Sequence, residues 1–562
     1  MVQSVFPIID QLKNYTPTCV RNDLAAGLTV AVILVPQGMA YAMLAGLPPV
    51  IGLYASTFPL IIYALLGTSR QLAVGPVAMV SLLVFTGVSP LAAPGTPQYV
   101  SIVLLLCLLA GILQILLGVL HAGFLVNYVS RAVISGFTSA AAIIIGINQL
   151  PLILGISIPT SHYPLISMIH ILRHSTEIHP MTCLLGISGI ALLIILKQGT
   201  PRLPGPLILL ILSTLAVSAF DLHAHGIRII ANVPAGLPKF SIPLFDAPAI
   251  LSLLPMVLTI VFIGYMESFA VAQSIATRER RSIDPDRELI ALGAADIAAG
   301  LFSGYPVTGG LSRTAVNDAA GARTGLAGLI TAGFMLFIVA FLTPVFYHVP
   351  VAALAAIILV AVIHLFAFRD LLRLLTIQLT DGLIFVTTFI LTLGFGVETG
   401  IAAGIILSLI LFIRRSARPH MAELGYCRER DAFLNIQRFP MAERYHQVLI
   451  IRIDASMFFA NAGFVRTQTR KLIESRPDIR QVIFDFEGVN DMDAVAVTML
   501  EDLIDEYDIR HVDFAFARLK GPVRDVLTRA GWHERYPGAI RFRSVRQVLT
   551  ELDIDSRIGT TI

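Results

Sequence analysis

The chain has 562 residues, of which 56% are hydrophobic and only 14% are charged. A soluble core cannot bury that much apolar surface, so the lipid bilayer must act as part of the solvent. The net charge of +3 is small and the basic residues form no long runs, which argues against a nucleic-acid partner. The four cysteines lie far apart without a CxxC pair, so we expect neither a metal centre nor a disulfide framework.

The apolar segments predict a polytopic helical membrane protein. Residues 1–23 contain no apolar run of signal-peptide length, so we expect them to form a cytoplasmic N-terminal segment. A transmembrane transport domain should occupy residues 24–416, where apolar runs follow one another with short Gly, Pro and charged breaks. About fourteen spans are predicted, some too short to cross the bilayer alone: 24–45, 50–66, 72–88, 100–121, 123–147, 182–198, 205–220, 250–274, 289–303, 310–320, 324–345, 351–366, 380–396 and 399–414.

The basic residues of the loops predict the orientation. With the N-terminus inside, only Arg173, Arg228 and Lys239 fall outside. Many more fall on the cytoplasmic side, as is typical of multi-pass proteins in a cell membrane: Arg70, Arg131, Lys197, Arg202, Arg278, Arg280, Arg281, Arg287, Arg323, Arg369, Arg373, Arg414 and Arg415.

Similar breaks recur at similar depths in two halves, about 24–220 and 250–416. PQGMAY at 36–41 corresponds to YMESFA at 265–270, and GPVAMVS at 75–81 corresponds to TGGLSRT at 308–314. Seven spans in each half would insert the halves in opposite senses. The pattern therefore predicts an inverted repeat, which is typical of carriers that work by alternating access.

The composition changes after the membrane segments. We interpret residues 417–435 as a linker and residues 436–555 as a small α/β domain. Strands are expected at 446–454, 480–488 and 510–517, with helices at about 462–475, 494–507 and 521–530. This alternation predicts a mainly parallel sheet.

The corresponding breaks GPVAMVS and TGGLSRT predict an anion site. Each places Gly or Pro beside a helix start in mid-membrane, and we expect Ala78, Gly310 and Leu311 to be among the residues that bind the anion. Two helix N-termini that face each other hold an anion with free N–H groups and positive dipole ends. Ser312 adds a hydroxyl donor. The alternative is that these glycines only permit tight helix packing.

Two charged residues are predicted deep in the membrane. Arg313 would reinforce the anion site from the first turn of its helix; a structural salt bridge or a snorkelling side chain is the alternative. Glu267 lies far from either end of its apolar run and would bind and release a proton as the site alternates, unless it pairs permanently with Arg313. Gln37 and Tyr41, four residues apart on one helix face after Pro36, would complete a polar wall.

These residues carry a resemblance to a known family. The run VPQGMAYAMLAGLPPVIGLYASTFPLIIYALLGTSRQLAVGPVAMVSLL (35–83), with GYMESFA (264–270), GYPVTGGLSRTAVN (304–317) and the terminal α/β domain, resembles the SulP family of sulfate permeases and related anion carriers. The resemblance covers essentially the whole chain. It implies seven plus seven inverted spans in core and gate domains, a C-terminal STAS domain and a homodimer.

The resemblance also implies roles for individual residues. Gln37, Tyr41, Val77, Ser312 and Arg313 match substrate-site positions of the family, between the third and tenth spans, and Glu267 matches the acidic residue linked to proton coupling. Many relatives have phenylalanine at the position of Tyr41. In the STAS domain Asp493 is followed by Ala494, so the phosphorylation switch of soluble relatives, which needs a serine there, is not expected.

Together these features predict a secondary active anion transporter, with proton-coupled sulfate symport as the leading hypothesis and sodium as an alternative coupling ion. Bicarbonate or dicarboxylate transport, chloride-linked anion exchange and an anion channel remain alternatives on the same scaffold. The spans contain no nucleophile and base pair, metal cluster or cofactor motif, so we expect no enzyme activity and no cofactor.

Overall fold

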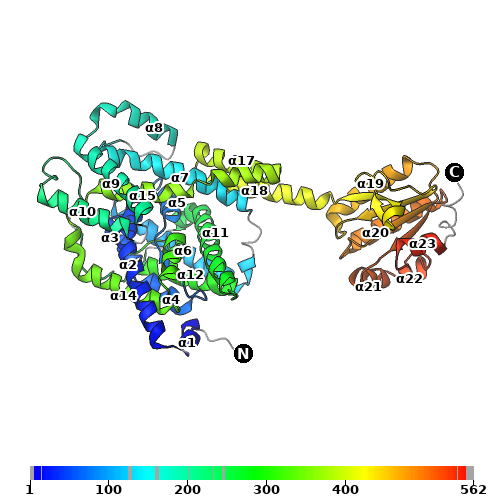
Figure 1. Ribbon diagram of the computed structural model, residues 1–562, viewed down its shortest axis with the longest axis horizontal. Helices are drawn as coiled ribbons and strands as arrows, with labels where there is room; N and C mark the ends of the chain where they lie inside the picture. The colour runs from blue at the N-terminus through cyan, green and yellow to red at the C-terminus, as the bar shows by residue number, and fades with distance from the viewer. Residues whose placement is uncertain are drawn as a thin grey trace. The chain divides into compact units, whose positions relative to one another are not determined.

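The computed structural model describes residues 6–13, 15–124, 130–158, 164–200, 203–231, 233–243, 247–540 and 542–551. The chain divides into two compact units, Met1–Ser408 and Leu409–Ile562. Helices dominate the first unit, whereas the second combines helices with a five-stranded sheet (Figure 1).

Most helices of the first unit overlap the predicted spans, although α5 begins six residues later than the span 72–88 and α7 lies about seven residues beyond the span 123–147. The N-terminal half holds α1 (Pro7–Leu12), α2 (Pro17–Leu44), α3 (Pro49–Tyr54), α4 (Phe58–Leu66), α5 (Ala78–Val88), α6 (Pro97–Val119), α7 (Arg131–Leu154), α8 (Pro164–Arg173), α9 (Pro180–Gly199) and α10 (Gly205–Ala219). The second half holds α11 (Ala247–Arg278), α12 (Pro285–Leu301), α13 (Leu311–Ala319), α14 (Leu326–Phe337), α15 (Val351–Val362), α16 (Phe368–Ile377), α17 (Leu379–Phe395) and α18 (Val397–Ala417).

Eight helical stretches among the described residues are long and apolar enough to cross a bilayer. Others are shorter apolar helices, α5, α10, α15 and α17 among them. Several long helices begin with proline, whose missing N–H costs nothing in the first turn; examples are Pro17, Pro97, Pro180 and Pro285. Short helices are what a repeat built around broken spans requires.

The helices pack in two groups. In the first group α6 lies along α12, α2 along α14, and α11 against α5 and α6. The α6–α12 contact needs two glycines, because a Cβ on Gly111 would lie 2.5 Å from the Gly293 carbonyl oxygen and a Cβ on Gly293 would lie 2.6 Å from that of Gly111. These approaches let the two backbones touch, as small residues commonly do between membrane helices.

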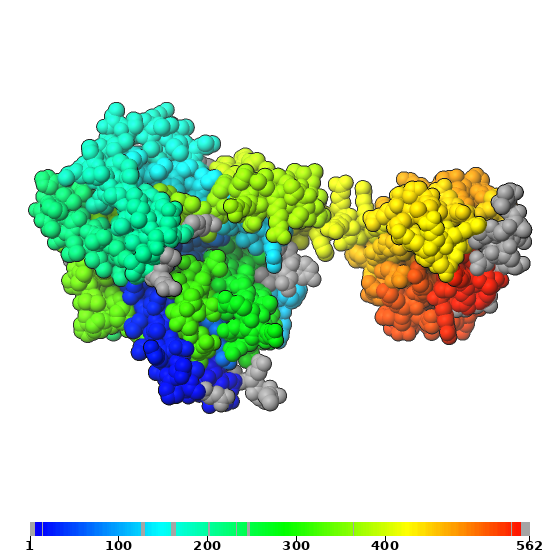
Figure 2. Space-filling model, viewed as in Figure 1, coloured from blue at the N-terminus to red at the C-terminus, as the bar shows by residue number. Residues whose placement is uncertain are grey.

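In the second group α7 packs against α15 and α17, and α9 packs against α10 and α15. A Cβ on Gly136 of α7 would lie 2.6 Å from the Phe385 carbonyl oxygen of α17, so this pair is also closely apposed. The segment that carries α8 to α10 forms a continuous region of the surface, coloured cyan to green (Figure 2).

The second unit is an α/β domain. Its strands are β3 (Met421–Cys427), β4 (Ala432–Asn435), β5 (Val448–Ile453), β6 (Gln481–Asp485) and β7 (Asp513–Ala517), in the order β4-β3-β5-β6-β7. β5, β6 and β7 are parallel, while β3 is antiparallel to both β4 and β5. The helices are α19 (Phe459–Glu474), α20 (Ala494–Asp508), α21 (Gly521–Arg529), α22 (Trp532–Arg535) and α23 (Val545–Glu551).

One part of the predicted linker belongs to this sheet. Residues 421–435, which the sequence analysis assigned to a linker, form the β3–β4 hairpin. β3 buries Ala422, Leu424 and Cys427, while Asp431 takes the left-handed conformation in the turn. The two strands are short and the turn between them is charged, so the sequence shows no apolar run that would predict a hairpin here. The predicted mainly parallel sheet therefore holds for three strands, to which the hairpin adds an antiparallel edge.

Candidate anion site

Two short strands bring the two predicted helix starts together. β1 (Val74–Gly75) pairs antiparallel with β2 (Thr308–Gly309), with Val74 opposite Gly309 and Gly75 opposite Thr308. The pairing continues where the Gly310 N–H donates to the Ala73 carbonyl at 3.1 Å. Because α5 begins three residues after β1 and α13 begins two residues after β2, the two helix starts follow directly from one small sheet.

Neither helix start is capped by a side chain. Val77 is the N-cap residue of α5 and Gly310 that of α13, and neither N-cap makes a side-chain capping hydrogen bond. The first N–H groups of each helix therefore keep their capacity to bind an anion. Val77 and Ala78 are buried, whereas Leu311 is 62% exposed and Ser312 is also exposed. The start of α13 thus faces accessible space.

Polar side chains that the sequence analysis did not assign to the site surround it: two accept hydrogen bonds from its backbone, and two hydroxyls pair with each other. Ser268 of α11 accepts a hydrogen bond from the Gly309 N–H at 2.8 Å, and Asp296 of α12 accepts one from the Val307 N–H at 2.8 Å. The Tyr305 hydroxyl lies 3.0 Å from that of Ser81 on α5. The position of Ser268, directly after Glu267 in a segment that corresponds to PQGMAY, was the one available signal.

Arg313 lies in the first turn of α13 and is 2% exposed. One of its terminal nitrogens donates to the Pro76 carbonyl, but its Nε and its other terminal nitrogen have no hydrogen-bond partner among the described residues. A Cβ on Gly310 would lie 2.9 Å from the guanidinium, so a glycine is needed beside it. The guanidinium interacts electrostatically with Tyr41, Tyr305 and Glu267.

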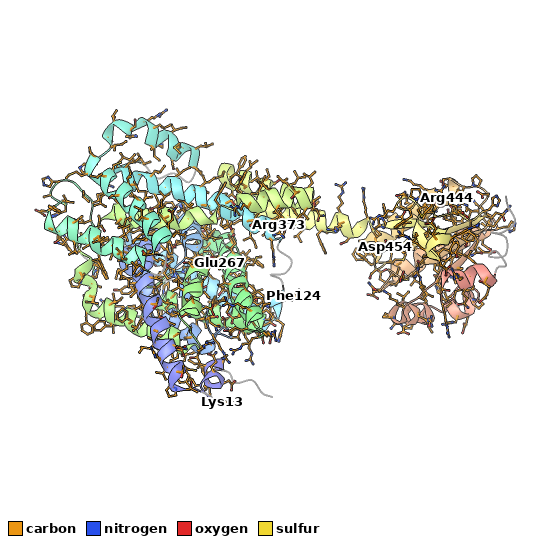
Figure 3. All side chains as sticks on the ribbon, in the orientation of Figure 1. Lys13, Phe124, Glu267, Arg373, Arg444 and Asp454 are labelled. Atoms are coloured by element: carbon orange, nitrogen blue, oxygen red, sulfur yellow. The ribbon has the colours of Figure 1, made fainter. Side chains whose placement is uncertain are left out.

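Glu267 projects from α11 inside the helical unit (Figure 3). Its Oε2 atom is buried without a hydrogen-bond partner among the described residues, and the structure shows no ion pair between it and Arg313. Glu267 and Arg313 therefore interact electrostatically without direct contact. This arrangement leaves the Glu267 Oε2 atom and two Arg313 nitrogens without hydrogen-bond partners among the described residues.

Gln37 and Tyr41 lie on α2, which packs against both α5 and α13. Gln37 is 8% exposed and Tyr41 is 7% exposed, so both are almost entirely enclosed. Pro36 removes one backbone N–H within this helix, directly before Gln37. Tyr41 interacts electrostatically with Arg313 and Glu267. All of the predicted site residues thus lie on α2, α5, α11 and α13 or at the starts of these helices.

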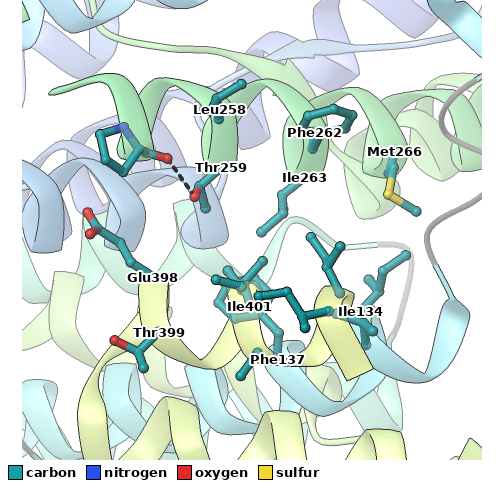
Figure 4. A pocket seen from close by; sticks show the side chains of 16 residues that line it. Ile134, Phe137, Leu258, Thr259, Phe262, Ile263, Met266, Glu398, Thr399 and Ile401 are labelled. Carbon is teal, nitrogen blue, oxygen red and sulfur yellow. Dashed lines mark hydrogen bonds between the residues drawn. The ribbon is translucent and has the colours of Figure 1, made fainter. Parts of the chain in front are cut away.

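A separate cavity of about 710 Å³ lies between α7, α11 and α18 (Figure 4). Its lining is almost entirely apolar, with Phe137, Phe262 and Ile401 among the residues shown. The Thr259 hydroxyl donates to the Pro255 carbonyl of its own helix, and Glu398 is the one carboxylate among the lining residues. Such a lining does not suit a hydrated dianion, so the helix starts around Arg313 remain the candidate anion site.

Two half-helices that begin beside a buried arginine, within a helical unit that has membrane-spanning stretches, suit a membrane transporter of anions. The chain belongs to the sulfate permease family, whose model matches residues 20–388, and residues 439–545 match the STAS domain. The predicted family and fold class are therefore confirmed, whereas the number of spans stays a prediction. Members of this family are transporters rather than enzymes, and they are membrane proteins.

Curated relatives match nearly the whole chain. A probable sulfate transporter 4.2 of Arabidopsis thaliana is 36% identical over 94% of this chain and 81% of its own length. A probable sulfate transporter of Mycobacterium tuberculosis is 34% identical over 93% of this chain and 94% of its own length.

Solved structures show the same fold. The murine Slc26a9 anion transporter in the inward-facing state matches with a TM-score of 0.90 at 23% identity, covering 98% of this chain and 94% of that one. The transmembrane domain of BicA, a cyanobacterial bicarbonate transporter, matches with a TM-score of 0.61 at 23% identity, covering 70% of this chain and 98% of that one. At these identities the likeness concerns the fold alone.

Proposed function

We propose that this protein is a proton-coupled sulfate symporter that works by alternating access. In this proposal the N-terminus and the STAS domain are cytoplasmic, and the protein is a homodimer in the cell membrane. Residues 24–416 form the transport domain, and Gln37, Tyr41, Val77, Ala78, Gly310, Leu311, Ser312 and Arg313 bind the anion.

The observation that carries the proposal is the pair of uncapped helix starts beside Arg313. The guanidinium is buried and keeps two nitrogens without a protein partner among the described residues. A buried polar group without a partner costs about 1–3 kcal/mol, and more when it is charged. An oxyanion that reaches these nitrogens and the free N–H groups of α5 and α13 would relieve that cost. The site is therefore suited to a small oxyanion.

The charges of the site favour coupling to a proton. With Glu267 ionised, Arg313 and Glu267 sum to zero, so a sulfate ion would bring the site to −2. With Glu267 protonated, Arg313 alone contributes +1 and the same ion brings the site only to −1. A net charge inside a membrane is costly, so protonation of Glu267 should favour sulfate binding. An inward proton gradient would then drive uptake.

The packing of the helices supports alternating access. The elements that carry the site, α2, α5, α11 and α13, pack with one another and with α6, α12 and α14. The other group contains α7, α9, α10, α15 and α17. We propose that the first group moves as a body against the second and carries the anion across, which corresponds to the core and gate domains of the family.

The test is sulfate uptake into liposomes that contain the purified protein. We expect an inward proton gradient to drive accumulation of radiolabelled sulfate in the wild type. Glu267→Gln, which cannot ionise, should abolish the response to the gradient while sulfate binding persists. Glu177→Gln, an exposed carboxylate after α8, is the matched control and should behave like the wild type. Stimulation by acid that survives in Glu267→Gln would contradict the assignment of Glu267.

A second variant tests the anion site itself. Arg313→Gln removes the cation and two of the unpaired donors, so sulfate binding should fall by at least about tenfold, because a hydrogen bond to a charged group contributes roughly 1.5–3 kcal/mol. Absence of sulfate uptake by the wild type, with bicarbonate or a dicarboxylate carried instead, would overturn the proposed substrate but not the site.

A further inference from the structure

A second cavity in the membrane unit, distinct from the site around Arg313, gathers three arginines. It has a volume of about 220 Å³, and its lining includes Arg70, Arg281 and Arg323. Each arginine comes from a different connection: Arg70 follows α4, Arg281 lies between α11 and α12, and Arg323 lies between α13 and α14. The sequence analysis placed all three on the cytoplasmic side, and the structure brings them to one cavity.

The positive charges of this cavity are not balanced by the carboxylates that line it. Asp10 lies beside Lys13, and Glu279 accepts a hydrogen bond from the Gln71 amide at 2.8 Å. The distance from Glu279 to Arg281 is 3.7 Å. Within the described part of the chain, no carboxylate forms an ion pair with Arg70 or Arg323. Arg70 and Arg323 therefore line the cavity without a close ion pair among the described residues, although Glu279 attracts Arg70 electrostatically.

Burial and the nearby Arg281 cation lower the pKa of the half-buried Arg70 guanidinium. Burial disfavours the charged form of this group, and a like charge nearby repels it. An anion between Arg70 and Arg281 would offset both effects. The electrostatics of the cavity thus agree with its geometry.

Buried carboxylates fix two of the connections that carry these arginines. Glu288 is fully buried and accepts hydrogen bonds from the Tyr63 hydroxyl at 2.8 Å, from the Thr68 N–H at 2.8 Å and from the Ser69 N–H at 2.9 Å. These bonds hold the backbone directly before Arg70. The arginine therefore projects from a rigid connection rather than from a loose one.

Asp23 plays the same part for Arg323. It is fully buried and accepts from the Arg323 N–H at 2.6 Å, the Thr324 hydroxyl at 2.6 Å and the Tyr15 hydroxyl at 2.9 Å. Gln11 of α1 accepts from the Gly325 N–H at 2.8 Å, which ties the N-terminal helix to the same connection. Preorganised walls of this kind reduce the entropy cost of binding a ligand.

We propose that this cavity is a second anion site, which binds a free tetrahedral oxyanion such as sulfate or phosphate between Arg70, Arg281 and Arg323. Its volume lies below the roughly 300–1,000 Å³ of sites for drug-sized ligands, so a small ion fits it better than a nucleotide. Arginine suits such an ion because its planar fork donates two hydrogen bonds at once. The bound ion would join three connections of the membrane unit and the N-terminal segment.

Protection from chemical modification tests the proposal on the unaltered full-length protein in micelles without anionic lipid. Phenylglyoxal modifies arginine side chains, and mass spectrometry reads each position separately. Millimolar sulfate or inorganic phosphate should slow modification of Arg70, Arg281 and Arg323 several-fold, while chloride at equal ionic strength should not. Arg173, an exposed arginine of α8, is the control and should show no protection. Equal protection at Arg173 would mean that the anions act only by charge screening, and it would overturn the proposal.

Binding measurements separate this cavity from the site around Arg313. Arg313→Gln should retain one class of sulfate site, and the further changes Arg70→Gln and Arg281→Gln should weaken that remaining binding by at least about tenfold. Arg313→Gln combined with Arg173→Gln should behave like Arg313→Gln alone. Unchanged binding in the Arg70 and Arg281 variants would overturn the proposal. So would protection that requires anionic phospholipid in nanodiscs and is absent with inorganic phosphate, because the ligand would then be a lipid headgroup.

Discussion

Ser268→Ala tests whether the backbone beside the anion site depends on one hydroxyl. Ser268 is fully buried, and its oxygen accepts from the Gly309 N–H at 2.8 Å while donating to the Gly264 carbonyl at 2.7 Å. Alanine leaves the Gly309 N–H without that acceptor, and an unsatisfied buried donor costs about 1–3 kcal/mol. If this cost falls on the conformation that binds the anion, affinity should drop by a factor of roughly 5–150.

The assay is equilibrium binding of radiolabelled sulfate to the purified protein, together with its thermal stability in detergent. Ser274→Ala is the matched control, because the Ser274 hydroxyl lies on the same helix and donates to the Val271 carbonyl at 2.8 Å. It should change the affinity by less than a factor of two. An affinity for Ser268→Ala equal to that of Ser274→Ala, in a protein that still binds sulfate, would refute the idea that Ser268 positions β2.

Three further changes test the packing and the ion pairs of the protein. Gly52→Ala places a Cβ 1.9 Å from the Gly38 carbonyl oxygen. It should therefore destabilise the contact of α3 with α2 by about 1–3 kcal/mol or more and lower the yield of folded protein. Gly463→Ala is the control and should not lower the yield, because a Cβ at Gly463 would meet no neighbouring atom within 4 Å. Arg518→Met removes the arginine partner of the fully buried Asp485. This should lower the free energy of unfolding of the α/β domain by roughly 3–5 kcal/mol. Unfolding can be followed by the fluorescence of Trp532, the single tryptophan of the chain. Hydrogen bonds from Arg546 and Tyr426 lower the pKa of Asp431 to about 2. Since the unfolded value is about 3.9, this contribution to stability is present above roughly pH 4 and is lost as the pH falls towards 2. Arg546→Gln should flatten that part of the acid unfolding curve, and an unchanged curve would contradict the pairing.

The sequence predicted the elements of the membrane unit well because apolar runs and their breaks are strong local signals. The correspondence between GPVAMVS and TGGLSRT identified the two segments that the structure joins as β1 and β2. Gly and Pro indicate where a helix is interrupted and starts again. In an inverted repeat, the corresponding interruptions of the two halves lie at the same depth in the membrane. The pattern therefore located the two broken segments, but not the start of α5 at Ala78, six residues inside the predicted span 72–88.

What the sequence could not supply were contacts between distant segments. Ser268 holds Gly309, and Tyr305 meets Ser81, across separations that no periodicity reveals. The β3–β4 hairpin was missed for a different reason, since its strands are short and their turn carries Arg428 and Asp431. The gathering of Arg70, Arg281 and Arg323 also depends on tertiary structure, although the loop charges already placed them on one side.

The acidic residues of the membrane unit show why position in a span is a poor guide to role. Glu288 and Asp23 are fully buried, as a proton-binding group would be, yet each accepts several hydrogen bonds from hydroxyls and backbone N–H groups of a neighbouring connection. Asp318 pairs with Arg278. Such carboxylates act as hydrogen-bond acceptors or ion-pair partners that hold the neighbouring segments in place. Glu267 differs because its Oε2 atom has no donor among the described residues and Arg313 stays out of contact. A carboxylate without fixed donors can gain and lose a proton at little structural cost, which is what the proposed proton coupling requires.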